Sequence, residues 1–477
     1  MSRGKELAKN TAILTFGKIC TQFVSFLLLP LYTAILEPEV YGISDLFNSY
    51  IYLIIPLVSL MLDQGLFRFL LDCRDDIKRQ KKLFSTVLCI NLIEILVYAV
   101  FYILLQNHIQ SEFKIFLFID VCLNVLLNTF MQFSRGIGQT GVYAFTSFLS
   151  ASSMVVSNVV LLAILKIGAW GLFISTVISR SISLIAIVIM LKSWKYFSIK
   201  NFSVIEAKKL MKYSFPFIPN QLSWWVIGAS DRTIISKFIS IAANGLYSVA
   251  NKFSSIYITF YNIFNLSWTE SVSLHINDED AEEYLKTTIN TLFSVFFAFC
   301  VGIIAYMPLV FPILINEQYN AAYYQIPILM IAVLFQIVVG LYSVIYVALK
   351  KSKEIAKTSF YAAVINIFVD VVLIKYIGLY AASLSTLVAY GTMAIYRYFH
   401  VKKYMDISLD NKMQYLFVMF LVNISYYHNG KITNYVTAII ITIYAIIANR
   451  EFVLSCFKMV VTTVEKMWIT IKRKKSK

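Results

Sequence analysis

Long, nearly uninterrupted runs of apolar residues alternate with short charged or turn-rich segments along the whole chain. A helix needs about 20 apolar residues to cross a hydrocarbon layer about 30 Å thick. Runs of that length predict fourteen membrane spans. They lie near residues 11–35, 42–70, 83–106, 113–134, 141–165, 170–192, 214–236, 245–270, 287–313, 323–348, 356–375, 379–399, 413–428 and 434–449.

The composition supports a membrane protein. Hydrophobic residues make up 59% of the chain, charged residues 14%, and the mean hydropathy is +0.72, whereas soluble domains carry about 25% charged residues. In lipid each backbone amide must be hydrogen-bonded within its own segment, and these runs are too long and too evenly apolar for barrel strands. We therefore predict an all-α integral membrane protein with about 14 transmembrane helices.

Lysine and arginine gather in alternate loops. The opposite loops hold only Lys114, Lys166, Lys237, Lys375 and Lys431. Under the positive-inside rule this bias places both termini in the cytoplasm, which requires an even number of spans. It also accounts for the net charge of +16 without nucleic acid, and makes anionic membrane lipids the expected partner of the basic loops.

The two halves of the chain share an internal repeat. IGAWGLFISTVIS opens at Ile167 and IGLYAASLSTLVA opens at Ile377, while Gly42 and Asn48 match Gly245 and Asn251. Because each copy holds six spans, the copies have the same orientation and are related by a pseudo-two-fold axis along the membrane normal. We predict an N-terminal lobe at 1–200, a C-terminal lobe at 201–405, and two extra helices with a basic tail at 406–477.

Charged side chains inside the predicted spans need partners or water, because an isolated charge in hydrocarbon is costly. They are Lys18, Asp63, Arg68, Glu94, Asp120, Arg180, Asp231, Arg232, Lys252, Glu270, Asp370 and Arg397. Arg68, Glu270 and Arg397 lie near helix ends, where they can reach the interface. Asp231 can pair with Lys252, and Lys18 can pair with Asp63, at similar depths. Arg180 and Arg232 then remain without an expected ion-pair partner. Surplus guanidinium groups in a water-filled cavity favour a phosphate or diphosphate ligand.

The run DRTIISKFISIAANGLYSVANKFSSI, from Asp231 to Ile256, resembles the pattern at helices 7 and 8 of the polysaccharide transporters in the multidrug/oligosaccharidyl-lipid/polysaccharide flippase superfamily. VYGISDLF at 40–47, GLFRF at 65–69 and SRGIGQTGVYA at 134–144 are similar to other parts of that family. The resemblance covers essentially the whole chain.

This resemblance implies a flippase rather than an enzyme. It would move polyprenyl-diphosphate-linked oligosaccharide repeat units from the cytoplasmic to the outer leaflet of the bacterial inner membrane, by alternating access, for O-antigen, capsule or exopolysaccharide synthesis. It implies no bound cofactor and a proton or sodium gradient as the energy source. Polysaccharide polymerase machinery is a further partner on this reading.

The candidate site residues fall into two groups. The cations expected to bind the diphosphate are Arg232, Arg180, Lys18, Arg68 and Lys252. The carboxylates expected to couple an ion or balance charge are Asp231, Asp63, Glu94, Asp120 and Asp370. For each carboxylate outside the Asp-Arg pair, a purely structural ion pair is the competing interpretation.

Two alternatives remain open. An ion-coupled exporter of cationic drugs would share the fold, and arginines that are fully paired or face lipid would favour it. A membrane polymerase or glycosyltransferase would need an outer loop or domain with catalytic groups, and the predicted outer loops are short and almost free of acid-base clusters.

Overall fold

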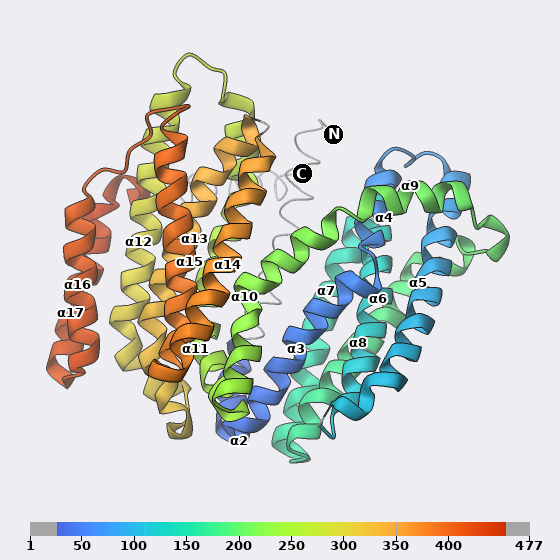
Figure 1. Ribbon diagram of the computed structural model, residues 1–477, viewed down its shortest axis with the longest axis horizontal. Helices are drawn as coiled ribbons and strands as arrows, with labels where there is room; N and C mark the ends of the chain where they lie inside the picture. The colour runs from blue at the N-terminus through green and yellow to red at the C-terminus, as the bar shows by residue number, and fades with distance from the viewer. Residues whose placement is uncertain (1–25, 110, 350, 455–477) are drawn as a thin grey trace, which may run out of the picture. The chain divides into compact units, whose positions relative to one another are not determined.

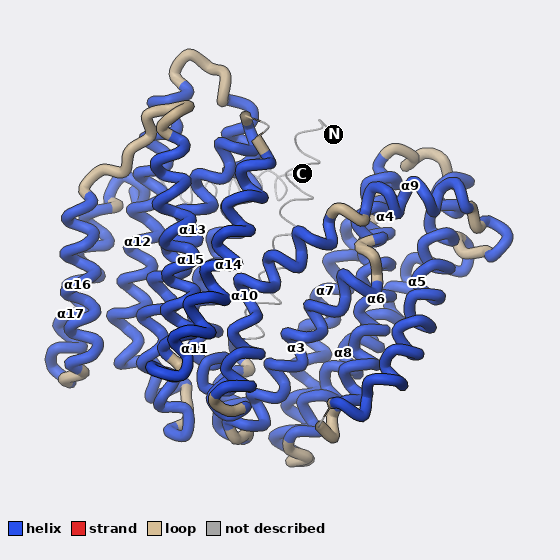
Figure 2. The backbone as a smooth tube through the Cα atoms, in the orientation of Figure 1, coloured by secondary structure: helices blue, strands red, loops and turns tan. Residues whose placement is uncertain are grey.

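The computed structural model describes residues 26–109, 111–349 and 351–454, and within these ranges every regular element is a helix (Figures 1 and 2). Nine helical stretches in this part of the chain are long and apolar enough to cross a membrane. The predicted all-α membrane fold is confirmed. Every predicted span after the first falls on a described helix, whereas most of the first span lies outside the described residues.

The chain forms two compact units. Unit 1 comprises residues up to 259 together with 315–325 and 356–389, and unit 2 comprises 260–314, 326–355 and 390 onward. Helices α11 (Ile241–His275), α14 (Ser352–Ile377) and α15 (Tyr380–Val401) contribute residues to both. The predicted lobe boundaries near 200 and 405 stay a prediction.

Unit 1 contains most of the N-terminal helices. They are α2 (Leu29–Ile35), α3 (Pro38–Val58), α4 (Leu62–Leu71), α5 (Ile77–Leu105), α6 (Lys114–Gly136), α7 (Thr140–Asn158), α8 (Ala169–Leu191), α9 (Val204–Ser214) and α10 (Phe217–Phe238). A π-helical turn, η2 (Val159–Ile164), extends α7. Helices α6, α7 and α8 pack side by side (Figure 1). A core of Leu66, Phe84, Phe133 and Leu210 joins α4, α5, α6 and α9.

Unit 2 contains α12 (Ala281–Leu314), α13 (Ile326–Ala348), α16 (Lys412–His428) and α17 (Lys431–Ala448). Helix α12 packs against the other three (Figure 1). Arg397 of α15 is buried in this unit, where it donates to the carbonyl oxygen of Val339 over 3.3 Å and to the hydroxyl of Ser343. Arg397 therefore bonds to the interior of unit 2 rather than reaching the interface as expected.

The span predicted at 42–70 is two helices. Leu60 and Met61 adopt positive φ angles of 46° and 56°, which ends α3 before α4 begins. Such angles are uncommon for residues other than glycine, so the apolar pattern holds no sign of the break. The repeat is visible in the backbone as well: Gly168 precedes α8 with φ of 60°, and Gly378 precedes α15 with φ of 57°.

Candidate functional site

A cavity of about 410 Å³ lies within unit 1, among α2, α3, α7, α8, α10 and α11. Its charged lining residues come from four helices: Asp45 from α3, Arg180 from α8, Arg232 from α10 and Lys252 from α11. The remaining wall is rich in hydroxyl and amide groups. It includes Tyr32, Tyr41, Tyr52, Ser44, Asn48, Ser49 and Thr176.

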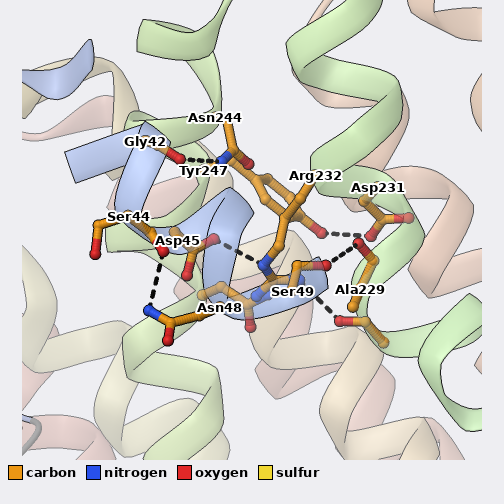
Figure 3. Close-up of polar contacts among 12 residues, drawn as sticks. Gly42, Ser44, Asp45, Asn48, Ser49, Ala229, Asp231, Arg232, Asn244 and Tyr247 are labelled. Atoms are coloured by element: carbon orange, nitrogen blue, oxygen red, sulfur yellow. Dashed lines mark hydrogen bonds and ion pairs between the residues drawn. The ribbon is translucent and has the colours of Figure 1, made fainter. Parts of the chain in front are cut away.

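Arg232 is held by two bonds at one side of this cavity. Its Nε donates to Oδ2 of Asp45 over 2.7 Å, and its Nη1 donates to the carbonyl oxygen of Gly228 over 2.8 Å (Figure 3). Both charged side chains of the pair are 14% exposed. The Nη2 group of Arg232 makes no hydrogen bond with a described residue, so the outer end of the guanidinium stays available to a ligand.

Arg180 is fixed by a second ion pair. Its Nη1 contacts Oδ1 of Asp120, which lies on α6 and is almost completely buried. Arg180 lines the cavity whereas Asp120 does not, so the carboxylate holds the arginine from outside the cavity. Within unit 1 the structure thus pairs both arginines that the sequence left over.

Lys252 lines the same cavity without a partner. It forms no hydrogen bond or ion pair with any residue in the described part of the chain. The expected alternative, a pair between Asp231 and Lys252, is not found there. Lys252 is therefore the surplus cation of the cavity, and the arginines are the cations whose charge a neighbouring carboxylate offsets.

Asp231 faces away from Arg232, into the helix bundle. It is 2% exposed, and its Oδ2 accepts hydrogen bonds from the Tyr247 hydroxyl over 2.7 Å and from the Thr386 hydroxyl over 3.0 Å. Successive helix residues point about 100° apart, which explains how two adjacent charged residues occupy different surroundings. Figure 3 shows the two contacts separately, with Arg232 bonded to Asp45 and the Asp231 carboxylate bonded to the Tyr247 hydroxyl.

A second polar cluster lies beside Asp231. Asp370 of α14 is fully buried, its two carboxylate oxygens have no hydrogen-bond partner among the described residues, and it interacts electrostatically with Asp231. Asn366, one turn earlier on α14, accepts from Ser230 over 3.5 Å and donates to Ser385 over 3.3 Å. Oδ1 of Asp231 likewise has no partner. The cluster thus gathers carboxylate, amide and hydroxyl oxygens from α10, α14 and α15.

The other candidate residues do not line this cavity. Arg68 is half-exposed and pairs with Asp72 over 2.7 Å at the end of α4, outside this cavity, and its role in binding substrate stays a prediction. Asp63 accepts from Gln64 over 2.7 Å, and the buried carboxylate of Glu94 has no hydrogen-bond partner among the described residues. Lys18 lies outside the described residues.

Two glycines hold α3 against the start of α11. A Cβ atom at Gly245 would overlap the carbonyl oxygen of Pro38, and one at Gly42 would overlap the carbonyl oxygen of Ile241. Asn244 donates to the carbonyl oxygen of Gly42 over 2.9 Å (Figure 3). The repeat-related glycines therefore meet, and this close crossing brings Asp45 and Lys252 to one cavity.

The charge pattern missed three residues of the site, namely Asp45, Tyr247 and Thr386. Asp45 lies in VYGISDLF and Tyr247 in the run from Asp231 to Ile256, both of which had been noted only for the resemblance. Asp45 escaped because it lies within about two turns of the polar start of its helix, where a carboxylate is expected to be solvated. Thr386 lies in the repeat IGLYAASLSTLVA, which had been noted only as a repeat.

Comparisons with known proteins agree with these observations. A family model described as "Polysaccharide biosynthesis protein" matches residues 7–269. The lipid II flippase MurJ in an inward closed conformation has a similar fold, with a TM-score of 0.69 at 15% identity over 94% of this chain and 100% of that one. No curated protein matches the chain significantly.

Multidrug resistance MATE family transporters share the fold. An inward-facing structure gives a TM-score of 0.68 at 12% identity, covering 82% of this chain and 98% of the other. An outward-facing structure gives 0.57 at 14% identity, covering 83% and 95%. At such identities the likeness concerns the fold alone.

Proposed function

We propose a flippase function for this chain, which belongs to the polysaccharide biosynthesis protein family and is a multi-pass membrane protein. The proposed substrate is a polyprenyl-diphosphate-linked oligosaccharide repeat unit, moved from the cytoplasmic to the outer leaflet of the bacterial inner membrane. The product would serve polysaccharide polymerase machinery that builds O-antigen, capsule or exopolysaccharide.

The observation that carries the proposal is the cavity with three cations and one lining carboxylate. Lys252 has no partner among the described residues, and Arg232 keeps its Nη2 group free of described partners. A diphosphate offers several anionic oxygens, and arginine binds such oxygens through a planar fork of donors. On this proposal Arg232 and Arg180 orient the diphosphate, and Lys252 supplies the unmatched charge.

The rest of the cavity wall suits a sugar. Tyr32, Tyr41 and Tyr52 present ring faces and hydroxyl groups, while Asn48 and Thr176 add donors and acceptors. Binding sites for polar ligands combine aromatic surface with a few polar groups that fix orientation. The proposed prenyl chain would remain in the surrounding lipid, since the cavity wall offers it a polar surface.

Ion coupling is proposed at the cluster around Asp231 and Asp370. Unpartnered carboxylate oxygens buried beside amide and hydroxyl oxygens are the ligand types that a hard cation or a proton prefers. Asp231 and Arg232 are neighbours on α10, so a change at the ion site is transmitted directly to the substrate site. Asp63, Glu94 and Asp120 remain further candidates for this role.

Export of a cationic small molecule is the second candidate. The observation that favours it is the pairing of both arginines with carboxylates, which leaves Lys252 as the cavity-lining cation without a partner among the described residues. Lys252 still repels a cationic ligand. A cationic drug would also leave the donors of Arg232 unused, so the anionic substrate fits better.

The test is the accumulation of lipid-linked oligosaccharide in the cytoplasmic leaflet of cells that carry Arg232→Ala or Asp231→Asn, with protein in the membrane quantified alongside. The control is Lys237→Ala, which removes an exposed cation from the end of the same helix. We expect accumulation in both site variants beyond what any fall in protein level explains, and none in the control. Unchanged translocation, or loss that only follows protein amount, would overturn the proposal.

A further inference from the structure

The segment from residue 192 to 215 connects α8 to α10 and lies across the ends of other helices. It contains two short 3-10 turns, η3 (Ser193–Lys195) and η4 (Ile199–Asn201), followed by α9. Figure 1 shows α9 crossing the ends of α4 and α5 instead of continuing along them. This is the end of unit 1 where the basic loops gather, which the charge bias places in the cytoplasm.

One side of the segment is fixed to the bundle. Ser85 of α5 donates to the carbonyl oxygen of Tyr196 over 3.2 Å and accepts from the backbone of Ser198 over 3.0 Å. Leu210 and Ser214 of α9 are fully buried, and a Cβ atom at Gly65 of α4 would meet the Ser214 hydroxyl. The segment is thus a firmly held part of the unit.

The opposite side exposes large apolar residues. Ile199 is 74% exposed, Ile205 66% and Phe215 63%, and Trp194 and Val204 are also more than half exposed. Soluble surfaces rarely gather so many exposed apolar side chains in one short segment, so the patch marks an interaction surface.

Lysines are interleaved with these apolar residues. Lys195, Lys200, Lys208, Lys209 and Lys212 are all exposed. The nearby carboxylate of Glu206 is buried, and its ion pair in the described part of the chain is with Lys209, at 3.7 Å. The surface therefore combines apolar side chains with several cations that have no carboxylate partner among the described residues.

We propose that the 192–215 segment is a binding site for anionic phospholipids at the membrane surface. The apolar side chains enter the boundary between headgroups and acyl chains, as in interfacial amphipathic helices, while Lys208 and Lys212 contact the headgroup phosphates. Such a site matches both the charge and the exposed apolar surface, and its position at the ends of spanning helices places it at headgroup depth. A protein partner would have to match the same alternation of charge and apolar surface.

The experiment uses the full-length protein in phosphatidylcholine vesicles that contain a fixed fraction of either brominated phosphatidylglycerol or brominated phosphatidylcholine. Bromine quenches tryptophan fluorescence at short range, and the difference in quenching between the wild type and Trp194→Phe isolates Trp194 from the other five tryptophans. We expect quenching by the brominated anionic lipid to exceed quenching by the neutral one by about twofold, because each lysine near an anionic surface adds attraction.

Three variants decide the outcome. Lys208→Gln/Lys209→Gln/Lys212→Gln should remove the preference, the matched lysine-to-arginine triple variant should keep it, and Trp194→Phe should remove the signal that reports it. If the triple glutamine variant is poorly expressed, Lys208→Gln/Lys212→Gln serves instead. The proposal would be overturned if the glutamine variants kept the preference for the anionic lipid, or if both lipids quenched the wild type equally. It would also be overturned if neither lipid quenched Trp194, and another occupant would then cover this surface.

Discussion

Arg232 donates from Nε to Oδ2 of Asp45 over 2.7 Å, which joins two helices whose residues lie 187 positions apart. This pair is largely buried and lines the cavity. It joins α3 to α10, and on the proposed function it also leaves the remaining guanidinium donors to the substrate.

Asp45→Asn should destabilise the protein, because it leaves a buried guanidinium without a counter-charge. Breaking one side of a buried ion pair costs about 3 kcal/mol, which thermal unfolding of the purified protein in detergent would detect. Asp45→Asn/Arg232→Met should recover most of that stability and still fail to translocate substrate. Equal stability of Asp45→Asn and the wild type would show that the pair contributes little.

Lys252→Met should behave in the opposite way. The lysine has no partner among the described residues, so its removal leaves no buried charge unmatched, and thermal stability should hold or rise. Translocation should fall by about tenfold or more, since one charge-assisted phosphate contact contributes about 1.5–3 kcal/mol. Lys252→Arg keeps the charge and should retain much of the activity. A fall in stability as large as that of Asp45→Asn would instead assign Lys252 a structural role.

Asp370→Asn should separate transport from the ion gradient. The buried carboxylate has no hydrogen-bond partner among the described residues, so the amide should be tolerated structurally, whereas an uncharged group no longer binds a cation or exchanges a proton. An ionophore that collapses the gradient should slow transport by the wild type and by the control Asp75→Asn, which changes an exposed loop carboxylate. It should leave transport by Asp370→Asn unchanged. Gradient-dependent transport by Asp370→Asn at the wild-type rate would locate coupling elsewhere.

Gly245→Ala should lower the amount of folded protein sharply. The new methyl group overlaps a backbone carbonyl that cannot rotate aside, and overpacking of this kind costs about 1–3 kcal/mol or more. Gly391→Ala is the matched control, because a Cβ atom there meets nothing within 4 Å and alanine improves helix propensity by about 0.5–1 kcal/mol. The thermal unfolding temperatures of both variants would be compared with that of the wild type. Equal unfolding temperatures for the two variants would contradict the prediction.

The positions of the helices could be predicted because hydrocarbon demands long apolar runs, and such runs are visible in a single sequence. The break at Leu60 and Met61 could not, since neither residue favours a left-handed backbone. Helix α9 was missed because it is short and rich in lysine, as a helix at the membrane surface should be.

Apart from Asp45, the charged residues of the site were identified individually, but their partners were only partly identified. Arg180 and Asp120 were both recognised as buried charges, and yet nothing in their spacing showed that they meet. The pairing of Asp231 with Lys252 rested on equal depth along two helices, and depth alone does not determine the direction in which a side chain points. Direction required the packed structure, which turns Asp231 toward Tyr247.

The crossing at Gly42 and Gly245 also fixes how genetic variation at these codons should be interpreted. Every missense change of a glycine adds at least one carbon, and here the first carbon already collides with backbone, so alanine should be nearly as harmful as a bulky residue. Gly138 is different: its space is open and its constraint is a φ of 85°, so asparagine should be the best-tolerated replacement there. The severity of a glycine variant in this protein thus depends on which of two physical limits applies at that codon: lack of space for any side chain at Gly42 and Gly245, or a left-handed φ at Gly138.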